Sequence, residues 1–109
     1  MTTLVIIESP YAGDVERNMR YLKDCVQDCL IRGESPYASH AFFTQFLDDN
    51  VPSERKLGID AGLAWANVSE YAVFYTDYGM SDGMVNALSY YKSIGKDVLF
   101  RRLHGDISG

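Results

Sequence analysis

Residues 71–84 have the sequence YAVFYTDYGMSDGM, in which an apolar run breaks into a polar loop just before a helical pattern begins. The apolar part, residues 71–75, is typical of a buried strand. A strand, a Gly/Ser turn and a helix N-terminus in this order direct several backbone N–H groups and the Ser81 hydroxyl toward one point, an arrangement that binds phosphates. The stretch therefore predicts an anion-binding site, with a plain turn as the alternative.

A β-α unit is also expected near the N-terminus. Residues 4–7 (LVII) form a continuous apolar run without alternation, which is typical of a strand covered on both faces. Asp14 is a good helix N-cap, and Gly33 suits the C-terminus of the helix that follows. The apolar stripe expected on this helix consists of Met19, Leu22, Val26, Cys29 and Leu30.

The remaining chain continues this alternation of strands and helices. Residues 34–39 predict a second strand, nearer a sheet edge because of Pro36, and residues 41–47 predict a short helix. A longer helix begins near Pro52, with an expected apolar stripe of Leu57, Ala61, Ala64 and Val68. The last helix ends at Gly95, before a strand at residues 98–100, and its expected apolar side chains are Met84, Ala87, Leu88 and Tyr91. Such alternation implies a parallel sheet with right-handed crossovers, so we expect a small Rossmann-like (flavodoxin-like) three-layer α/β domain with a four- or five-strand parallel sheet.

Composition limits the size of the protein and the classes of partner. A chain of 109 residues with 47% hydrophobic residues buries one core, so residues 1–109 are expected to form a single domain. The net charge of −5 argues against nucleic-acid polymers and anionic membranes as partners, because both require a basic face. A small phosphorylated ligand is compatible with this charge, because local N–H dipoles and one or two basic side chains suffice to bind it.

Location, metal content and self-association are inferred from the same composition. The apolar run at residues 4–7 is too short to span a membrane and lacks the flanks of a signal peptide, so we expect a cytoplasmic protein of a bacterial or phage-infected cell. Cys25 and Cys29 lie four apart in a helical pattern and are interpreted as small core side chains, with no metal ion and no cofactor expected. Eight tyrosines and one tryptophan exceed what a four-strand sheet covers, which predicts a homodimer or a larger homo-oligomer.

Candidate ligand-binding residues follow the strands, because ligands of open parallel sheets bind outside the carboxyl ends of the strands. They are Ser9, Tyr11, Gly13, Asp14, Arg17, Ser39, His40, Asp77, Gly79, Ser81, Gly83 and Met84. Asp60 and Asp77 are the carboxylates considered for acid-base catalysis, with a solvated surface position as the alternative for Asp60. Other structural roles remain open too, because Asp14 and His40 suit helix caps and Tyr11 suits core packing.

Two further features of the sequence bear on function. No nucleophile elbow, Walker loop, zinc signature or complete dinucleotide fingerprint is present, which excludes the commonest strong enzyme assignments. The pentapeptide Glu-Ser-Pro-Tyr-Ala occurs at residues 8–12 and again at residues 34–38. The first copy is expected after a strand and the second within one, so we interpret the repeat as coincidence rather than duplication.

Several blocks of the sequence resemble the nucleoside 2-deoxyribosyltransferase-like superfamily, and the chain looks closest to a phage and prophage branch of it. The resemblance covers nearly the whole chain, in the blocks Ser9-Pro10-Tyr11-x-Gly13, Arg32-Gly33-Glu34, Ala38-Ser39-His40, Leu47-Asp48-Asp49-x-x-Pro52-x-Glu54-Arg55, Gly58-Ile59-x-Ala61-Gly62-x-x-Trp65 and Tyr75-Thr76-Asp77-x-Gly79-x-Ser81-x-Gly83-Met84. The resemblance implies a Rossmann-like fold that handles the N-glycosidic bond of nucleosides and nucleotides. In the catalytic members, a glutamate four residues after a Ser-x-Gly turn attacks the anomeric carbon, and an aspartate in the preceding helix assists.

The match to the catalytic members is partial. Ser81 and Gly83 correspond to the turn and Asp60 to the assisting aspartate, but the position of the nucleophile holds Ala87. An alanine cannot form a glycosyl ester. The resemblance therefore implies a protein that binds a nucleotide or a nucleotide-derived small molecule, including a phage protein that sequesters a nucleotide immune signal. The alternatives are a nucleoside or nucleotide N-glycosidase or deoxyribosyltransferase with a non-standard carboxylate, and an assembly protein with an aromatic interface.

Overall fold

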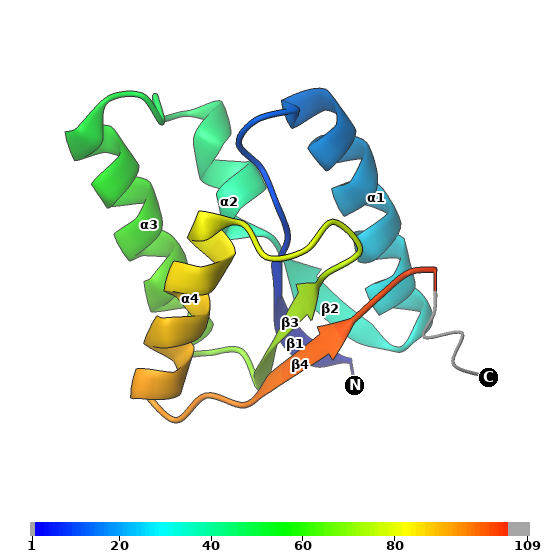
Figure 1. Cartoon of the computed structure of the whole chain (residues 1–109). Coiled ribbons are helices and arrows are strands. Elements are labelled where there is room, and N and C mark those ends of the chain that lie inside the picture. Colours follow the sequence, from blue (N-terminus) through cyan, green and yellow to red (C-terminus); the bar gives the residue numbers. More distant parts are fainter. Residues whose placement is uncertain (1, 105–109) are drawn as a thin grey trace.

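Four parallel strands form the centre of the protein in the computed structural model, which describes residues 2–104 (Figure 1). The strands are β1 (Thr3–Glu8), β2 (Glu34–Tyr37), β3 (Tyr71–Tyr75) and β4 (Val98–Arg101), and their order in the sheet is β2-β1-β3-β4. The Rossmann-like α/β fold is confirmed, with four strands, and β2 lies at an edge as its proline predicted.

Helices cover both faces of this sheet and give three layers. α1 (Val15–Ile31) lies on one side in Figure 1, and α3 (Pro52–Ala66) and α4 (Asp82–Ser93) lie on the other. Between β2 and α3 the chain forms α2 (Ser39–Phe42) and the 3₁₀ turn η1 (Phe43–Gln45), where one short helix over residues 41–47 was expected. No helix among residues 2–104 is long and apolar enough to cross a membrane.

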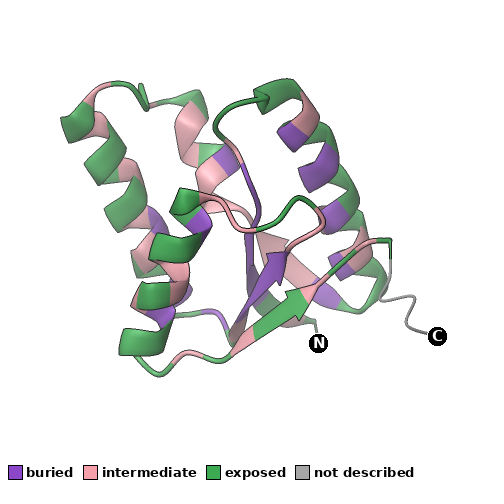
Figure 2. Ribbon diagram, in the orientation of Figure 1, coloured by how far each residue is buried: buried purple, intermediate pink, exposed green. Residues whose placement is uncertain are grey.

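Side chains of β1 and β3 alternate between two cores, because successive residues of a strand point to opposite faces. The core on the α1 side contains Val5, Ile7, Val73 and Tyr75 with Tyr21, Leu22, Cys25, Cys29 and Ala41. The core on the side of α3 and α4 contains Ile6, Ala72 and Phe74 with Ala66, Met84 and Tyr91. Figure 2 shows that these two strands are the buried centre of the protein. Their burial on both faces explains the absence of an apolar/polar alternation in the sequence.

α1 buries a stripe that differs in part from the expected one. Cys25 and Cys29 are buried free thiols, as predicted, and Leu22 is buried with them. Met19 and Leu30, which were expected in the stripe, are exposed. Asn18 and Tyr21 are buried in their place. The polar side-chain atoms of both residues are hydrogen-bonded, which makes their burial possible.

The apolar stripe expected on α3 was wrong. Leu57 is exposed, Val68 lies beyond the helix and is exposed as well, and α3 buries Gly62 and Ala66 instead. The cause is a close approach to α2, since a Cβ atom at Gly62 would lie 2.5 Å from Ser39 Oγ and 2.8 Å from Ser39 Cβ. Small residues thus allow α3 to lie against α2, and the larger apolar side chains of the helix point elsewhere.

We predict that Gly62→Ala lowers the free energy of unfolding by about 1–3 kcal/mol, because the added methyl group has no room beside Ser39. Gly58→Ala is the matched control in the same helix, since its Cβ would lie at an ordinary 3.4 Å from Leu47 Cδ1. Alanine there is expected to add about 0.5–1 kcal/mol through helix propensity. Urea unfolding measures both variants, and similar effects of the two substitutions would contradict the close contact of α2 and α3.

Candidate functional site

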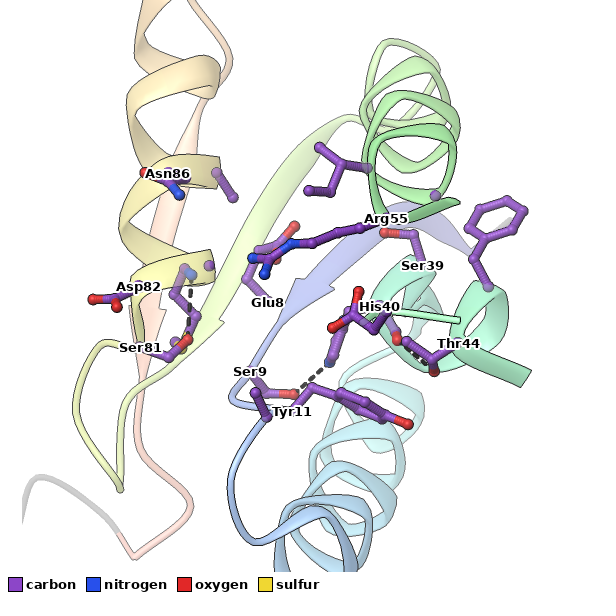
Figure 3. A pocket seen from close by; sticks show the side chains of 18 of the residues that line it. Glu8, Ser9, Tyr11, Ser39, His40, Thr44, Arg55, Ser81, Asp82 and Asn86 are labelled. Carbon is purple, nitrogen blue, oxygen red and sulfur yellow. Dashed lines mark hydrogen bonds between the residues drawn. The ribbon is translucent and has the colours of Figure 1, made fainter. Parts of the chain in front are cut away.

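A pocket of about 560 Å³ opens at the carboxyl ends of β1 and β3, among the first turns of α2, α3 and α4 (Figure 3). β1 and β3 are neighbours in the sheet, while β2 and β4 lie outside them on opposite edges. The connections that leave β1 and β3 therefore diverge. This divergence is the topological switch point at which open parallel sheets bind ligands, and the volume is in the range for a small-molecule site.

Eight of the predicted ligand-binding residues line this pocket. They are Ser9, Tyr11, Gly13, Ser39, His40, Ser81, Gly83 and Met84. They come from the β1–α1 loop, from α2 and from the first turn of α4, so three segments far apart in the sequence meet here. Ala87, which the sequence resemblance aligns with a catalytic glutamate, also lines the pocket.

The other predicted binding residues lie outside the pocket and have structural contacts. Asp14 caps α1 by accepting a hydrogen bond from the Arg17 backbone N–H at 3.1 Å. The Arg17 guanidinium carbon lies 4.0 Å from the centre of the Tyr78 ring. Gly79 has a φ of +82° in the loop after β3, which explains the glycine by conformation alone.

Both carboxylates considered for catalysis also lie outside the pocket. Asp77 accepts hydrogen bonds from the Tyr21 hydroxyl and from the backbone N–H groups of Leu103 and His104. Burial opposes ionisation of Asp77, yet these hydrogen bonds lower its pKa below the ordinary value. Asp60 is an exposed residue of α3 that pairs with Lys56 at 2.6 Å. The hydrogen bonds of Asp77 thus link the segment after β4 to α1, and Asp60 forms a surface ion pair.

The β1–α1 loop is held by a buried asparagine that the sequence did not single out. The Asn18 side-chain amide donates to the backbone carbonyls of Tyr11 at 2.9 Å and Ala12 at 3.2 Å. In a trans peptide the N–H points opposite to the carbonyl, and the described residues contain no cis bond. The N–H groups of Ala12 and Gly13 are therefore directed away from Asn18, and both residues line the pocket.

The first turn of α4 offers a second set of N–H groups. Ser81 is the N-cap, and its Oγ accepts the Met84 N–H at 3.3 Å. The N–H groups of Asp82 and Gly83 belong to the first turn, so they have no acceptor within the helix. The Asp82 carboxylate points away from Glu8 in Figure 3. The first turn of α4 can therefore donate hydrogen bonds to an anionic group.

Glu8 is the most unusual side chain of the pocket, and no local signal in the sequence identified it. It ends β1, is only 8% exposed, and its Oε2 accepts a hydrogen bond from the Tyr91 hydroxyl at 2.5 Å. Burial raises the pKa of Glu8 from 4.5 to about 7, although the hydrogen bond from Tyr91 partly offsets this rise. The site therefore contains a carboxyl group that exchanges its proton near neutral pH.

Ser9 and His40 form a polar pair beside Glu8. Their Oγ and Nε2 atoms are 2.9 Å apart. Burial lowers the pKa of His40 to about 4, so the imidazole is neutral at pH 7. Its Nδ1 is buried and has no hydrogen-bond partner among residues 2–104. The pair thus holds the Ser9 hydroxyl in a fixed position at the end of β1.

The wall opposite α4 is largely apolar, with one basic side chain. Its apolar members are Phe43, Leu47, Ile59 and Leu63. Among residues 2–104, Arg55 is the only arginine or lysine that lines the pocket. Arg55 extends toward the middle of the pocket in Figure 3, and no ion pair within 4.0 Å joins it to Glu8 in the described part of the chain. The pocket thus combines a flat apolar side, a donor-rich side and a buried carboxyl. Within residues 2–104, no group of three or more His, Cys, Asp or Glu side chains is arranged to hold a metal ion.

The chain is a small Rossmann-like domain with a pocket at the switch point of its sheet. Residues 3–101 match the family model described as "Domain of unknown function (DUF7768)", and the chain belongs to this family. Neither the curated proteins nor the solved structures contain a significant match to the chain.

Stability should depend on pH through Glu8, and Glu8→Gln tests this. The raised pKa stabilises the folded state below about pH 4.5, and this contribution of up to about 3 kcal/mol is lost as the pH rises through 7. Because Gln does not titrate, the variant should gain stability relative to the native protein between pH 5 and pH 8.5. Urea unfolding at these two pH values measures the difference.

Glu34→Gln provides a control of opposite sign. The hydrogen bonds from Arg101, at 2.7 and 2.6 Å, lower the pKa of Glu34 to about 2, although burial opposes this. Glu34→Gln should therefore destabilise the protein at pH 8.5, by about 3 kcal/mol. If Glu8→Gln lowered the free energy of unfolding by the same amount at pH 5 and at pH 8.5, the raised pKa of Glu8 would be contradicted.

Proposed function

We propose that the pocket binds a nucleotide or a nucleotide-derived small molecule. The observation that supports this proposal is the difference between the two sides of the pocket, one rich in hydrogen-bond donors and the other largely apolar. The first turn of α4 offers the N–H groups of Asp82 and Gly83, while the opposite wall presents Phe43 and Ile59. A nucleotide has the same polarity, with phosphate at one end and a flat, largely apolar base at the other. The N–H groups of Ala12 and Gly13, which point away from Asn18, add donors on the side of the β1–α1 loop.

Binding without consumption of the ligand is the form of this function that the lining residues favour. Ala87 occupies the pocket position that carries the attacking glutamate in the resembling family, and a methyl group cannot form a glycosyl ester. Loss of a covalent nucleophile removes several orders of magnitude in rate. A protein of this kind would hold a nucleotide-derived signal and lower its free concentration, which is how we propose that it acts.

Cleavage of an N-glycosidic bond is the second candidate function, and Glu8 is the observation that favours it. The lining carboxylates are Glu8, Asp49, Glu54 and Asp82, and Glu8 alone among them is buried. A buried carboxyl whose pKa is near 7 can serve as a general acid or base, and carboxylate-assisted attack by water requires no covalent intermediate. In this function Glu8 would replace Asp60 and Asp77, which lie outside the pocket.

We predict that Ser81→Asp weakens the binding of nucleoside monophosphates at least tenfold, because it places a negative charge at the proposed phosphate position. Aspartate remains a good N-cap, so the melting temperature should change by only a few degrees. Ser81→Ala is the matched control, which removes the cap but adds no charge and should retain most of the affinity. Isothermal titration calorimetry with nucleosides and their monophosphates measures both effects. Equal affinity of the native protein for ligands with and without phosphate would contradict the proposal.

The same samples distinguish binding from cleavage. After incubation with nucleosides, nucleoside monophosphates and NAD-derived nucleotides, chromatography of the denatured mixture measures free base. Recovery of unchanged ligand is expected. Multiple turnovers that Glu8→Gln abolishes, and that Asp60→Asn and Asp77→Asn leave intact, would establish the second candidate function instead.

We also propose that the chain forms a homodimer or a larger homo-oligomer through an exposed aromatic cluster of Tyr37, Phe42, Phe46 and Trp65. Ring centres in the cluster lie 5.3–6.1 Å apart, and Phe46 and Trp65 are 69% and 56% exposed. The cluster contains no charged side chain, so two acidic copies can meet there without repulsion between close charges.

Light scattering at micromolar concentration should give a mass of at least two chains, and Phe46→Ser should reduce it to that of one chain. Ile31→Ser is the control, because Ile31 is also apolar and exposed but lies on α1, outside the cluster. A native protein with the mass of one chain would exclude self-association at this concentration.

A further inference from the structure

We propose that Glu8 recognises the sugar of the bound nucleotide by accepting a hydrogen bond from a ribose hydroxyl, so that the pocket prefers ribonucleotides to their deoxy analogues. This inference rests on the proposed function and extends it to the class of sugar. It assigns a specificity role to a side chain that is not among the candidate ligand-binding residues expected from the sequence.

The position of Glu8 places it beside the middle of a bound nucleotide. Figure 3 shows Glu8 between the first turn of α4, with Ser81, and the segments that carry Ser39 and Thr44. With phosphate at the α4 end and the base against Phe43 and Ile59, the group that lies next to Glu8 is the sugar. The two ends of the pocket therefore determine which part of the ligand the carboxyl meets.

Glu8 is held in place by α4 but still has an unused acceptor. Tyr91 is fully buried, its ring centre lies 5.9 Å from that of Phe74, and its hydroxyl donates to Oε2 of Glu8. Oε1 accepts no hydrogen bond from any of residues 2–104, and Glu8 lines the pocket. A ligand hydroxyl can therefore donate to Oε1 without displacing a hydrogen bond within the described residues. Tyr91 is accordingly a positioning residue for this contact.

Neither Ser9 nor Arg55 donates a hydrogen bond to Oε1 of Glu8 in the described part of the chain, so the ligand can supply this donor. The Ser9 hydroxyl is paired with His40, and Arg55 forms no ion pair with Glu8 in the part of the chain that the structure describes. A carboxylate repels phosphate, and it can accept hydrogen bonds but cannot donate them. The parts of a nucleotide that it can bind are therefore hydroxyl and N–H donors. The base N–H groups are assigned to the far wall by the geometry above, which leaves the 2′- and 3′-hydroxyls.

Recognition of this kind has a signature in pH. The Tyr91 hydroxyl of α4 donates to Glu8. The other charged and titratable groups that line the pocket are Asp82 of α4, Glu54 and Arg55 of α3, His40 of α2, Tyr11 of the β1–α1 loop and Asp49 of the loop before α3. The pKa of Glu8 is about 7, whereas His40 with a pKa of about 4 stays neutral above pH 5.5. An ionised carboxylate accepts a stronger hydrogen bond than a neutral carboxyl. Preference for ribose should therefore increase from pH 5.5 to pH 8.5.

Calorimetry of the native protein with a ribonucleoside monophosphate and its 2′-deoxy and 3′-deoxy analogues tests the inference. At pH 8.5 we expect at least one analogue to bind about tenfold more weakly, as the loss of a hydrogen bond to a charged group implies. At pH 5.5 the ratio should fall to within about threefold. The phosphate also titrates in this pH range, but it does so in all three ligands. Its effect therefore cancels in the ratio of their affinities.

Two variants separate recognition from a structural role. Glu8→Gln should retain phosphate-dependent binding, with a ratio of affinities that no longer changes with pH, and Tyr91→Phe should reduce the ratio at pH 8.5 while the ring still packs on Phe74. Equal affinity of the native protein for all three ligands at both pH values would overturn the inference and leave the proposed function intact. Absence of binding of any of the three would overturn both. If neither variant folds, the pH series of the native protein decides the matter.

Discussion

Parallel pairing of β1 with β3 is the interaction on which the rest of the structure depends. The register places Ile7 beside Val73 and Glu8 beside Phe74, so the two most buried strands end at the same level. Because β2 and β4 are paired outside them, the connections diverge and leave the space between these ends uncovered. The same pairing directs Glu8 to the face of α4, where the Tyr91 hydroxyl donates a hydrogen bond to it. Pocket, carboxyl and donor-rich helix terminus thus follow from one strand contact.

The repeated pentapeptide shows how strongly tertiary context determines the chemistry of a side chain. Glu8 and Glu34 begin identical five-residue sequences, and both are buried. Glu34 meets the Arg101 guanidinium, which lowers its pKa to about 2, whereas Glu8 meets only a hydroxyl and burial raises its pKa to about 7. Arg101 and Tyr91 lie far from their partners in sequence, so neither environment is encoded near the glutamate. One copy supports the sheet, and the other lines the pocket.

Sequence reasoning predicted the features that depend on local patterns. The apolar runs of β1 and β3, the capping residue Asp14 and the small core thiols of α1 all lie where the sequence indicated. Features that depend on contacts between distant elements could not be predicted. α3 turns Leu57 outward because Gly62 must approach Ser39, and α1 buries Asn18 because the β1–α1 loop supplies two carbonyls. The structural role of Asp77 could not be predicted for the same reason, because its hydrogen-bond partners lie in α1 and after β4, far from it in the sequence.

We propose that a nucleotide binds in the space between the ends of β1 and β3. This is tested by an assigned ¹H–¹⁵N correlation spectrum recorded during titration with a panel of nucleoside 5′-monophosphates. The largest saturable shifts are expected for the amides of Ala12, Gly13, Asp82 and Gly83. All four residues line the pocket, and their N–H groups either point away from Asn18 or start α4 without a helical acceptor. Saturable shifts that leave these four amides unchanged, or no shifts at millimolar nucleotide, would contradict it.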